Sequence, residues 1–194
     1  MAQRTSMRDK PVLQRLEYRP VTSRRLYDLQ VFSQCHGRFR YCSCMRWRIP
    51  SSEYKRSTKD ERVAALDALV RRDSPVGVLA YVDHDPVGWC SVAPRETCSA
   101  LERYQALRRI DDAVVWSVVC FFVAASHRRQ GLRFGLLQAA ISYARSCGAK
   151  LIEAYPAEPG ALYGYMGSPS LFESAGFRDV TPVGRDRRIL RLDL

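Results

Sequence analysis

The most constraining feature of the sequence is a long apolar run that ends in a basic, glycine-containing loop, VVWSVVCFFVAASHRRQGLRFG, at residues 114–135. Residues 114–123 are apolar at nearly every position, so both faces of the strand that they predict must be covered. Such a strand belongs in the middle of a sheet. Arg128, Arg129 and Gly131 then follow where this buried strand opens toward solvent.

A helix and a second strand are expected after the loop. Apolar residues recur at helical spacing on one face of the next segment, and they are Leu132, Leu136, Leu137, Ala140, Ile141 and Ala144. Gly148 is placed to end this helix in a left-handed conformation, and KLIEAYP then predicts a strand. A strand, a helix and a strand in succession predict a βαβ unit with parallel strands and a right-handed crossover.

The remaining segments predict further strands and helices around this unit. Residues 76–95 hold two apolar runs separated by Asp83, His84, Asp85 and Pro86, a turn sequence typical of a β-hairpin. The other expected elements are an edge strand at 13–21, helices at 23–35 and 61–72, a short helix opened by Ser168, and a closing hairpin at 177–194. The predicted fold class is α+β, with a central mixed β-sheet whose parallel βαβ core is flanked by helices.

The length predicts one domain. With 194 residues we expect a flexible tail at 1–10 and a single domain at 11–194, as a monomer or a homodimer. No apolar run reaches the roughly eighteen residues needed to span a bilayer, and the N-terminal MAQRTSMRDK lacks the apolar segment of a secretion signal. We therefore expect no membrane association and a cytoplasmic location.

The cysteines do not predict a metal site. Seven is an odd number for a disulfide scaffold, and in a reducing compartment they are better interpreted as buried packing residues. Cys42 and Cys44 are close in sequence, but the other cysteines and the three histidines are scattered singly, whereas a structural zinc site usually takes two close pairs. We expect no metal.

The charge balance is strongly basic. The net charge is +11, and 27 of the 31 basic residues are arginine. Because the planar guanidinium suits phosphate and carboxylate groups, this excess favours a phosphate-rich partner such as a coenzyme, a tRNA or an acidic carrier protein. Codon usage in a GC-rich genome would produce the same excess, and composition alone does not separate the two.

The loop at 127–135 is a candidate anion site. A loop that leaves a buried strand and turns directly into a helix points unpaired N–H groups at one place, beside the positive end of the helix dipole. Gly131 lets the main chain approach an anion closely, and Arg128 and Arg129 add positive charge, which together suit a pyrophosphate. Alternatively, Gly131 merely eases a turn and the arginines are solvated. Neither a Walker lysine-serine pair nor a complete dinucleotide fingerprint is present, which disfavours nucleotide hydrolysis and hydride transfer.

The same residues resemble a known family. VCFFVAASHRRQGLRFGLLQAAISYARSCGA is similar to the coenzyme A-binding core of the GNAT superfamily of N-acyltransferases, whose loop pattern is Arg or Gln, any two residues, Gly, any residue, and Gly or Ala. The later SLFESAGF resembles the family's penultimate helix. The order of the elements agrees from about Leu13 to the C-terminus. CSCMRWR, GWCSVAPR and EAYP are also similar to a bacterial branch of the family.

The resemblance implies that acetyl-CoA or another acyl-CoA is the cosubstrate, without a metal. Main-chain amides of residues 130–133 would hold the pyrophosphate, and main-chain groups of Phe121 and Val123 would pair with pantetheine where two parallel strands splay apart. The expected binding residues are Phe121, Val123, Arg128, Arg129, Gln130, Gly131, Leu132 and Arg133. Arg133 occupies the position where the family has a second small residue.

Acyl transfer to an amine requires a neutral nucleophile and stabilisation of a tetrahedral oxyanion. By family analogy, the Val123 N–H is the expected oxyanion donor. Many relatives place a glutamate base in the same strand where this chain has Ser117, which we expect on the same face as Phe121 and Val123; it would orient a water chain or serve as a small packing residue. Glu153 is the nearest carboxylate by topology, and strand alternation directs it either into the cleft or away from it.

The departing thiolate also needs a proton. Relatives often carry a tyrosine where this chain has Phe172, so the expected donor is one of the tyrosines just before it, and Tyr165 is our choice. The alternative is that Tyr155, Tyr163 and Tyr165 only form a lid or a pocket wall, an interpretation we favour for Tyr163.

The predicted function is N-acyl transfer, in which an acetyl or other acyl group moves from a coenzyme A thioester to a small-molecule amine by direct attack in a ternary complex. In a variant of this hypothesis an acyl carrier protein or an aminoacyl-tRNA is the donor. A third hypothesis is a non-catalytic module that binds coenzyme A or nucleic acid, because the usual glutamate and tyrosine are missing.

Overall fold

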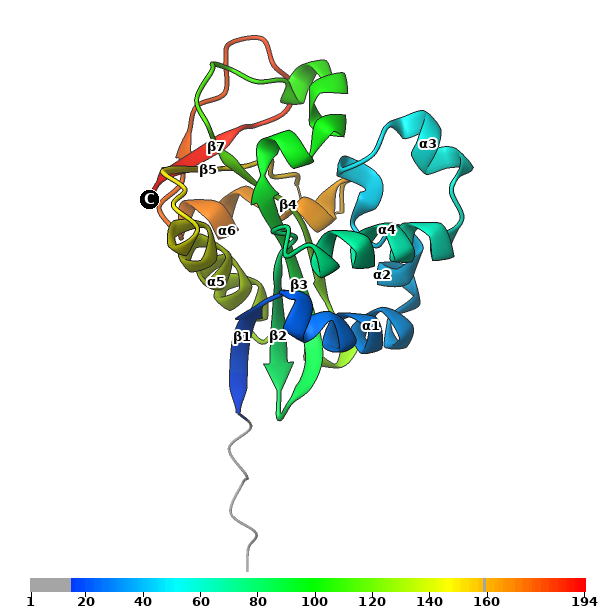
Figure 1. Ribbon diagram of the computed structural model, residues 1–194. Coiled ribbons are helices and arrows are strands. Elements are labelled where there is room, and N and C mark those ends of the chain that lie inside the picture. The colour runs from blue at the N-terminus through cyan, green and yellow to red at the C-terminus, as the bar shows by residue number, and fades with distance from the viewer. Residues whose placement is uncertain (1–14, 159) are drawn as a thin grey trace, which may run out of the picture.

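The computed structural model describes residues 15–158 and 160–194, so the tail expected at 1–10 lies outside the described residues. One sheet dominates the described chain (Figure 1). Its strands are β1 (Leu16–Pro20), β2 (Val78–Val82), β3 (Asp85–Pro94), β4 (Trp116–Val123), β5 (Leu151–Ala154), β6 (Arg178–Asp179) and β7 (Leu190–Asp193). The helices are α1 (Leu26–Cys35), α2 (Gly37–Cys42), α3 (Ser51–Arg56), α4 (Lys59–Arg71), α5 (Leu132–Ser146) and α6 (Pro169–Glu173).

The sheet is mixed, in the order β1-β2-β3-β4-β5-β7-β6. Neighbouring strands run antiparallel except β4 and β5, which are parallel and are connected through α5. The α+β class, the mixed sheet and the parallel βαβ core predicted from the sequence are therefore confirmed. β6 and β7 form the expected closing hairpin, and β7 is the strand of the two that pairs with β5.

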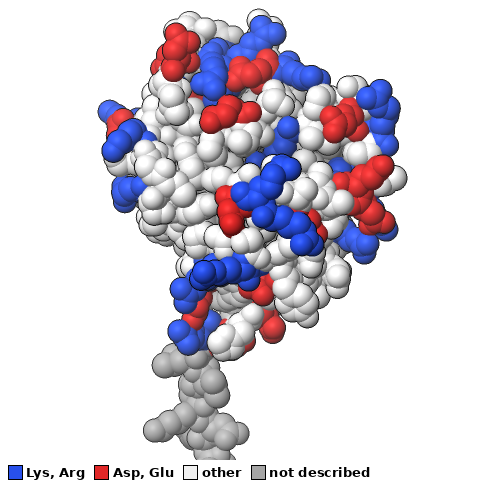
Figure 2. Space-filling model, in the orientation of Figure 1, with Lys and Arg blue, Asp and Glu red and all other residues white. Residues whose placement is uncertain are grey.

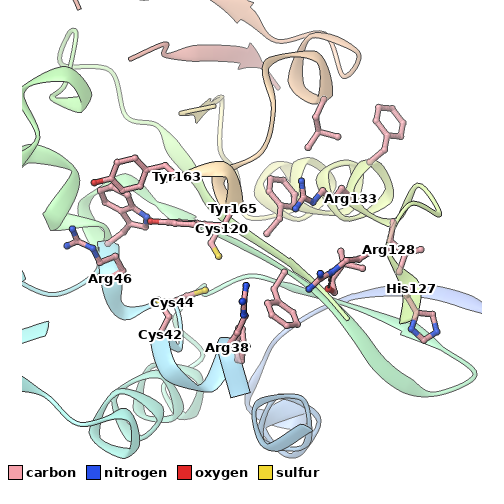
Figure 3. A pocket seen from close by; sticks show the side chains of 18 of the residues that line it. Arg38, Cys42, Cys44, Arg46, Cys120, His127, Arg128, Arg133, Tyr163 and Tyr165 are labelled. Atoms are coloured by element: carbon pink, nitrogen blue, oxygen red, sulfur yellow. Dashed lines mark hydrogen bonds between the residues drawn. The ribbon is translucent and has the colours of Figure 1, made fainter. Parts of the chain in front are cut away.

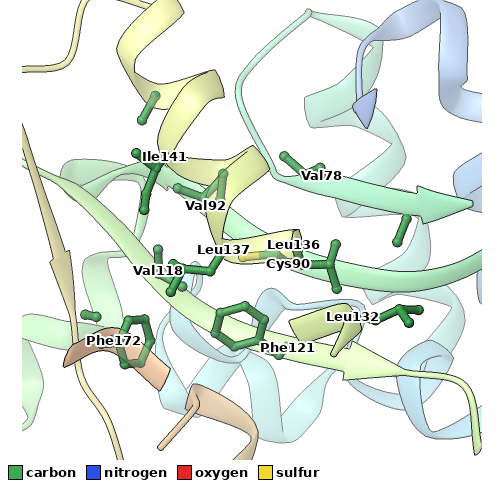
Figure 4. Packing of buried hydrophobic residues seen from close by; sticks show 14 of the residues in the cluster. Val78, Cys90, Val92, Val118, Phe121, Leu132, Leu136, Leu137, Ile141 and Phe172 are labelled. Carbon is green, nitrogen blue, oxygen red and sulfur yellow. The ribbon is translucent and has the colours of Figure 1, made fainter. Parts of the chain in front are cut away.

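Helices cover both faces of the sheet, with α5 and α6 on one side and α1, α2 and α4 on the other (Figure 1). All six α5 residues that the helical spacing marked as inward-facing are buried. They pack against Val78, Cys90, Val92 and Val118 of the strands, as Figure 4 shows. Burying this apolar face holds the first turn of α5, and the loop before it, firmly at the end of β4.

Two helices begin at residues that the spacing did not predict. α4 starts at Lys59, two residues before the expected Glu61, because Thr58 and Glu61 form a capping box: the Glu61 N–H donates to Thr58 Oγ1 (3.2 Å) and the Thr58 N–H donates to Glu61 Oε2 (2.7 Å). α1 starts at Leu26, after a 3-10 turn at Ser23–Arg25, rather than at residue 23. Capping geometry therefore sets the start of α4, whereas neither Thr22 before the 3-10 turn nor Arg25 before α1 forms a side-chain cap hydrogen bond.

β4 carries a bulge that reverses the alternation of its side chains. The register between β3 and β4 shifts after Ser91, which leaves Val119 as an extra residue. Phe121 and Val123 belong to the core beneath α5, whereas Ser117 lies on the opposite face. The prediction that Ser117 shares a face with Phe121 and Val123 is wrong, because it assumed unbroken alternation along the strand.

The two central parallel strands separate after a short pairing. β4 and β5 pair only where Trp116 to Val118 lie opposite Ile152 to Ala154. β5 ends there, while β4 continues to Val123. Among the described strands none covers this edge of β4 beyond Val118, so the middle of the sheet has an open edge close to the loop before α5.

Basic and acidic side chains lie beside one another over much of the face shown in Figure 2. Ion pairs of the described chain include those of Arg188 with Glu173 (2.7 Å) and Asp179 (2.8 Å), and that of Arg19 with Glu17 (2.7 Å). Among the described residues, no helix is both long enough and apolar enough to cross a bilayer.

Candidate active site

A cavity of about 1030 Å³ opens beside the exposed edge of β4. Its lining comes from the end of β4 with the loop that follows, from residues 38–54, and from the turn at residues 162–165. Figure 3 shows Arg128 and Arg133 at one end of this space and Arg46 at the other, with Tyr165 and Cys120 between them. The cavity therefore connects the predicted anion site to a second, separate region.

The main chain of Phe121 and Val123 faces the open edge. The Ala124 N–H donates to Val87 O (2.8 Å), so these two residues form a hydrogen-bonded pair of the β3–β4 ladder. Hydrogen-bonded and non-hydrogen-bonded pairs alternate along an antiparallel ladder, so Val123, and then Phe121, direct their N–H and C=O groups away from β3. These are the groups that the family resemblance implied for pantetheine.

The loop before α5 presents a row of free main-chain amides. Within the described part of the chain, the N–H groups of residues 129–133 donate to no acceptor. Gly131 precedes α5 with φ 77° and Arg129 has φ 60°, and such left-handed turns direct successive N–H groups toward one point. This point lies at the positive end of the α5 dipole, where an anion is stabilised.

Seven of the eight residues expected to bind the cofactor line the cavity. The exception is Gln130, whose side-chain amide donates to Ser126 O (3.2 Å) and so folds back onto the loop.

We call Arg128, Arg129 and Arg133 the loop arginines. Arg128 Nε donates to Val123 O (3.1 Å), which ties its guanidinium to the end of β4. Within residues 15–158 and 160–194, the other two loop arginines form no ion pair.

Tyr165 lines the middle of the cavity, on the 3-10 turn Gly164–Met166 (Figure 3). Burial raises the pKa of its phenol, so the hydroxyl keeps its proton at neutral pH and is able to donate it. The ring packs edge-on against Tyr163, with centroids 6.1 Å apart, and Tyr163 packs in turn against Trp47 at 5.8 Å.

Ser117 and Glu153 come together behind the cavity rather than in its lining. The Tyr155 hydroxyl donates to Glu153 Oε2 (2.7 Å), and Ser117 Oγ lies 2.7 Å from Tyr155 Oη, so the serine hydroxyl donates to the tyrosine. Arg95 Nη1 donates to Glu153 Oε2 (2.9 Å) and Arg191 Nε to Oε1 (2.8 Å). The sequence left the direction of Glu153 open, and the structure turns it into this buried network. The catalytic roles of Ser117 and Glu153 stay predictions.

Three cysteines, Cys42, Cys44 and Cys120, line the cavity as free thiols. Trp89 Nε1 donates to Cys44 Sγ (3.0 Å). Contact with Cys44 and burial raise the pKa of the Cys120 thiol well above its usual value, which disfavours Cys120 as a nucleophile. Among the described residues, no group of three or more His, Cys, Asp or Glu side chains is placed to hold a metal ion.

The wall opposite the loop was not assigned from the sequence. Residues 38–54 contribute Arg38, Phe39, Cys42, Cys44, Arg46, Trp47 and Tyr54 to the lining. The chain reaches the cavity here through two successive left-handed residues, Ser43 (φ 44°) and Cys44 (φ 49°), which follow α2. The dense mixture of aromatic and basic residues in RYCSCMRWR is the sequence signal that could have identified this wall.

The fold and the cavity define the class of enzyme that the resemblance implied, an acetyltransferase. Residues 41–164 match the model of the acetyltransferase (GNAT) family, and the chain therefore belongs to this family. The resemblance stated from the sequence is confirmed. No curated protein matches the chain.

Solved structures share the fold at low sequence identity. A polyamine N-acetyltransferase of Drosophila melanogaster is 15% identical, with a TM-score of 0.56, and the match covers 93% of this chain and 100% of that one. The putative acetyltransferase yncA of Salmonella typhimurium, solved with acetyl-CoA, is 17% identical, with a TM-score of 0.52 and coverages of 92% and 94%. PaiA N-acetyltransferase of Thermoplasma acidophilum, solved in complex with coenzyme A, is 13% identical, with a TM-score of 0.52 and coverages of 93% and 99%.

Proposed function

We propose that the protein transfers an acetyl or other short acyl group from a coenzyme A thioester to the amine of a small molecule, by direct attack in a ternary complex. The observation that carries the proposal is the continuity of one cavity from the free amides of residues 129–133 to the open edge of β4. A diphosphate fits the first and the amide groups of a pantetheine arm fit the second. The Salmonella and Thermoplasma structures, solved with acetyl-CoA and coenzyme A, support this assignment.

The proposed chemistry uses groups that line this cavity. The amine lone pair attacks the thioester carbonyl carbon, the C–N bond forms, and the N–H of Val123 stabilises the oxyanion. The C–S bond then breaks, the sulfur takes a proton from the Tyr165 phenol, and the nitrogen loses its surplus proton to water, from which the tyrosine is reprotonated. The cavity's main contribution is to hold amine and thioester in contact.

Tyr165→Phe is expected to lower kcat about tenfold while leaving the KM for acetyl-CoA nearly unchanged, since the ring stays and only the proton donor is lost. The effect stays modest because a thiolate leaves readily even without an acid. Steady-state kinetics across pH 6–9 measures it. Tyr163→Phe is the matched control, with kcat within about twofold of the parent. A kcat within about twofold of the parent in both variants would show that the two tyrosines serve only as cavity wall.

The proposal itself is tested with the full chain, purified acetyl-CoA and a panel of primary amines. We expect acetyl-CoA binding by calorimetry and acetylated amine by mass spectrometry. Binding of acetyl-CoA without transfer to any amine would favour the non-catalytic module. Transfer that occurs only from a loaded carrier protein or an aminoacyl-tRNA, and weakens steeply with salt, would favour a macromolecular donor.

A further inference from the structure

The cavity is lined by positive side chains without a compensating carboxylate. Five arginines line it and, among the described residues, no aspartate or glutamate does; the five are Arg38, Arg46, Arg128, Arg129 and Arg133. None of the five lies within ion-pair distance of a described carboxylate. Elsewhere many arginines are paired, including Arg40, Arg95, Arg178, Arg188 and Arg191. The charge in the cavity is therefore available to the substrates.

Arg46 is held in place by aromatic rings. Its guanidinium carbon lies 5.6 Å from the ring centre of Trp47 and 5.7 Å from that of Tyr54. Its Nη2 donates to Tyr104 Oη, and its Nη1 donates to Ser51 Oγ (3.3 Å). These contacts fix the plane of the guanidinium, while its other N–H groups, which bond to no described residue, remain for a ligand.

The phosphates of coenzyme A do not account for Arg46. The loop arginines surround the N-terminus of α5, whereas Arg46 lies at the other end of the cavity, beyond Tyr165 and Cys120 (Figure 3). If Tyr165 protonates the thiolate, the thioester must end near Tyr165, and the space between Tyr165 and Arg46 belongs to the acceptor.

We propose that the acceptor is an amino acid, meaning an amine with a carboxylate close to it, and that Arg46 binds the carboxylate. This inference rests on the proposed function and names its substrate class. A planar guanidinium on an aromatic platform suits two-point binding of a carboxylate. Trp47 and Tyr54, the two cavity-lining rings beside Arg46, suit an apolar or aromatic side chain on the acceptor.

The cavity arginines also act on the reacting amine, and two further arginines outside the lining add to their charge. Arg62 lies 4.6 Å from the ring centre of Tyr54, and Arg187 lies 4.8 Å from that of Tyr163. Positive charge near an ammonium group lowers its pKa and so favours the neutral amine, which is the nucleophile. This compensates for the lack of a described carboxylate base in the lining. A polyamine, in contrast, would bring further positive charge into a cavity that has no described acid to receive it.

The test compares matched acceptors at saturating acetyl-CoA. Each set contains an amino acid, its amide and its decarboxylated amine: phenylalanine, phenylalaninamide and 2-phenylethylamine, and leucine, leucinamide and isoamylamine. O-phosphoethanolamine and spermidine are two further acceptors, one with a phosphate and one with additional amines. We expect kcat/KM for each amino acid to exceed that of its amide and its decarboxylated amine by about tenfold or more, the effect of one charge-assisted hydrogen-bonding partner. Mass spectrometry of the acetylated product measures it, and calorimetry measures acceptor binding to the coenzyme A complex.

Arg46→Gln is expected to bring each matched set to within about twofold of one another, chiefly by raising the KM for the amino acid. Arg46→Lys should restore part of the preference, which a purely structural role would not explain. Arg145→Gln, on the exposed face of α5, is the control and should behave as the parent does. An unchanged melting temperature and acetyl-CoA affinity show that the variants are folded.

The outcomes separate this inference from the proposed function. Acetyl-CoA binding with no preference for carboxylate-bearing acceptors, in turnover or in binding, overturns the inference and leaves acyl transfer standing. A preference for O-phosphoethanolamine over both amino acids, or for spermidine, overturns it equally. Failure to bind acetyl-CoA at all removes both.

Discussion

Gly131→Glu is expected to raise the Kd for acetyl-CoA about 100-fold relative to Gly131→Gln, which corresponds to roughly 2.7 kcal/mol of lost binding free energy. The expected loss comes from charge. A Cβ at residue 131 meets no heavy atom within 4 Å, so the new side chain enters open space at the cavity lining. There its carboxylate occupies the position proposed for the diphosphate. Two like charges about 4 Å apart near a protein surface repel by several kcal/mol.

Glutamine is a matched control for this prediction. Gly131 has φ 77°, so both substitutions carry the same cost of a left-handed conformation, roughly 1–2 kcal/mol. A glutamate at the N-terminus of α5 also interacts favourably with the helix dipole, so the glutamate variant should be at least as stable as the glutamine variant. Calorimetric titration with acetyl-CoA, beside the melting temperatures, measures the difference. Equal affinities would place the diphosphate away from this loop.

The local features of this site were predictable because each depends only on residues close together in the sequence. The apolar run of β4, the spacing of Leu132 to Ala144 and the glycine at 131 are encoded within a few residues of one another, and the structure confirms the strand and the helix. The left-handed conformation of Gly131 is an additional finding of the structure. The free amides follow from the same local geometry, since a helix cannot pair its own first N–H groups.

Features that depend on pairing with distant segments were not predictable. The bulge at Val119 exists because of the register with β3, and it moves Ser117 to the opposite face of the strand. The direction of the Glu153 side chain depends on its hydrogen bonds with Arg95 and Arg191. Arg95 comes directly after β3, and Arg191 lies on β7, so both are distant from Glu153 in the sequence. The arginines at 38 and 46 reach the cavity because α2 packs against the face of the sheet, where Phe39 contacts Trp89 and Phe122.

Glu153→Leu is expected to lower the free energy of unfolding by about 4 kcal/mol, because removing one member of a buried ion pair leaves its partners uncompensated. The side chains of Glu153 and Arg95 are 2% and 1% exposed, so water cannot replace the lost carboxylate. Urea unfolding followed by tryptophan fluorescence measures the loss. The matched control is Glu173→Leu, which removes a glutamate whose ion pair with Arg188 is 49% and 40% exposed, and it should cost less than about 1 kcal/mol.

Activity separates a structural Glu153 from a catalytic one. Glu153→Gln keeps the volume and an oxygen acceptor for Arg95, so enough folded protein should remain for kinetics at low temperature. If the network only supports β4 and β5 behind the cavity, kcat/KM per folded molecule stays within about threefold of the parent. If Glu153 instead receives the amine proton through Tyr155 and Ser117, the same variant loses about 100-fold in kcat/KM. In that case the loss should also appear in Tyr155→Phe, which breaks the hydrogen bonds to both Ser117 and Glu153. Because Glu153 does not line the cavity and accepts from two arginines, we expect the first result.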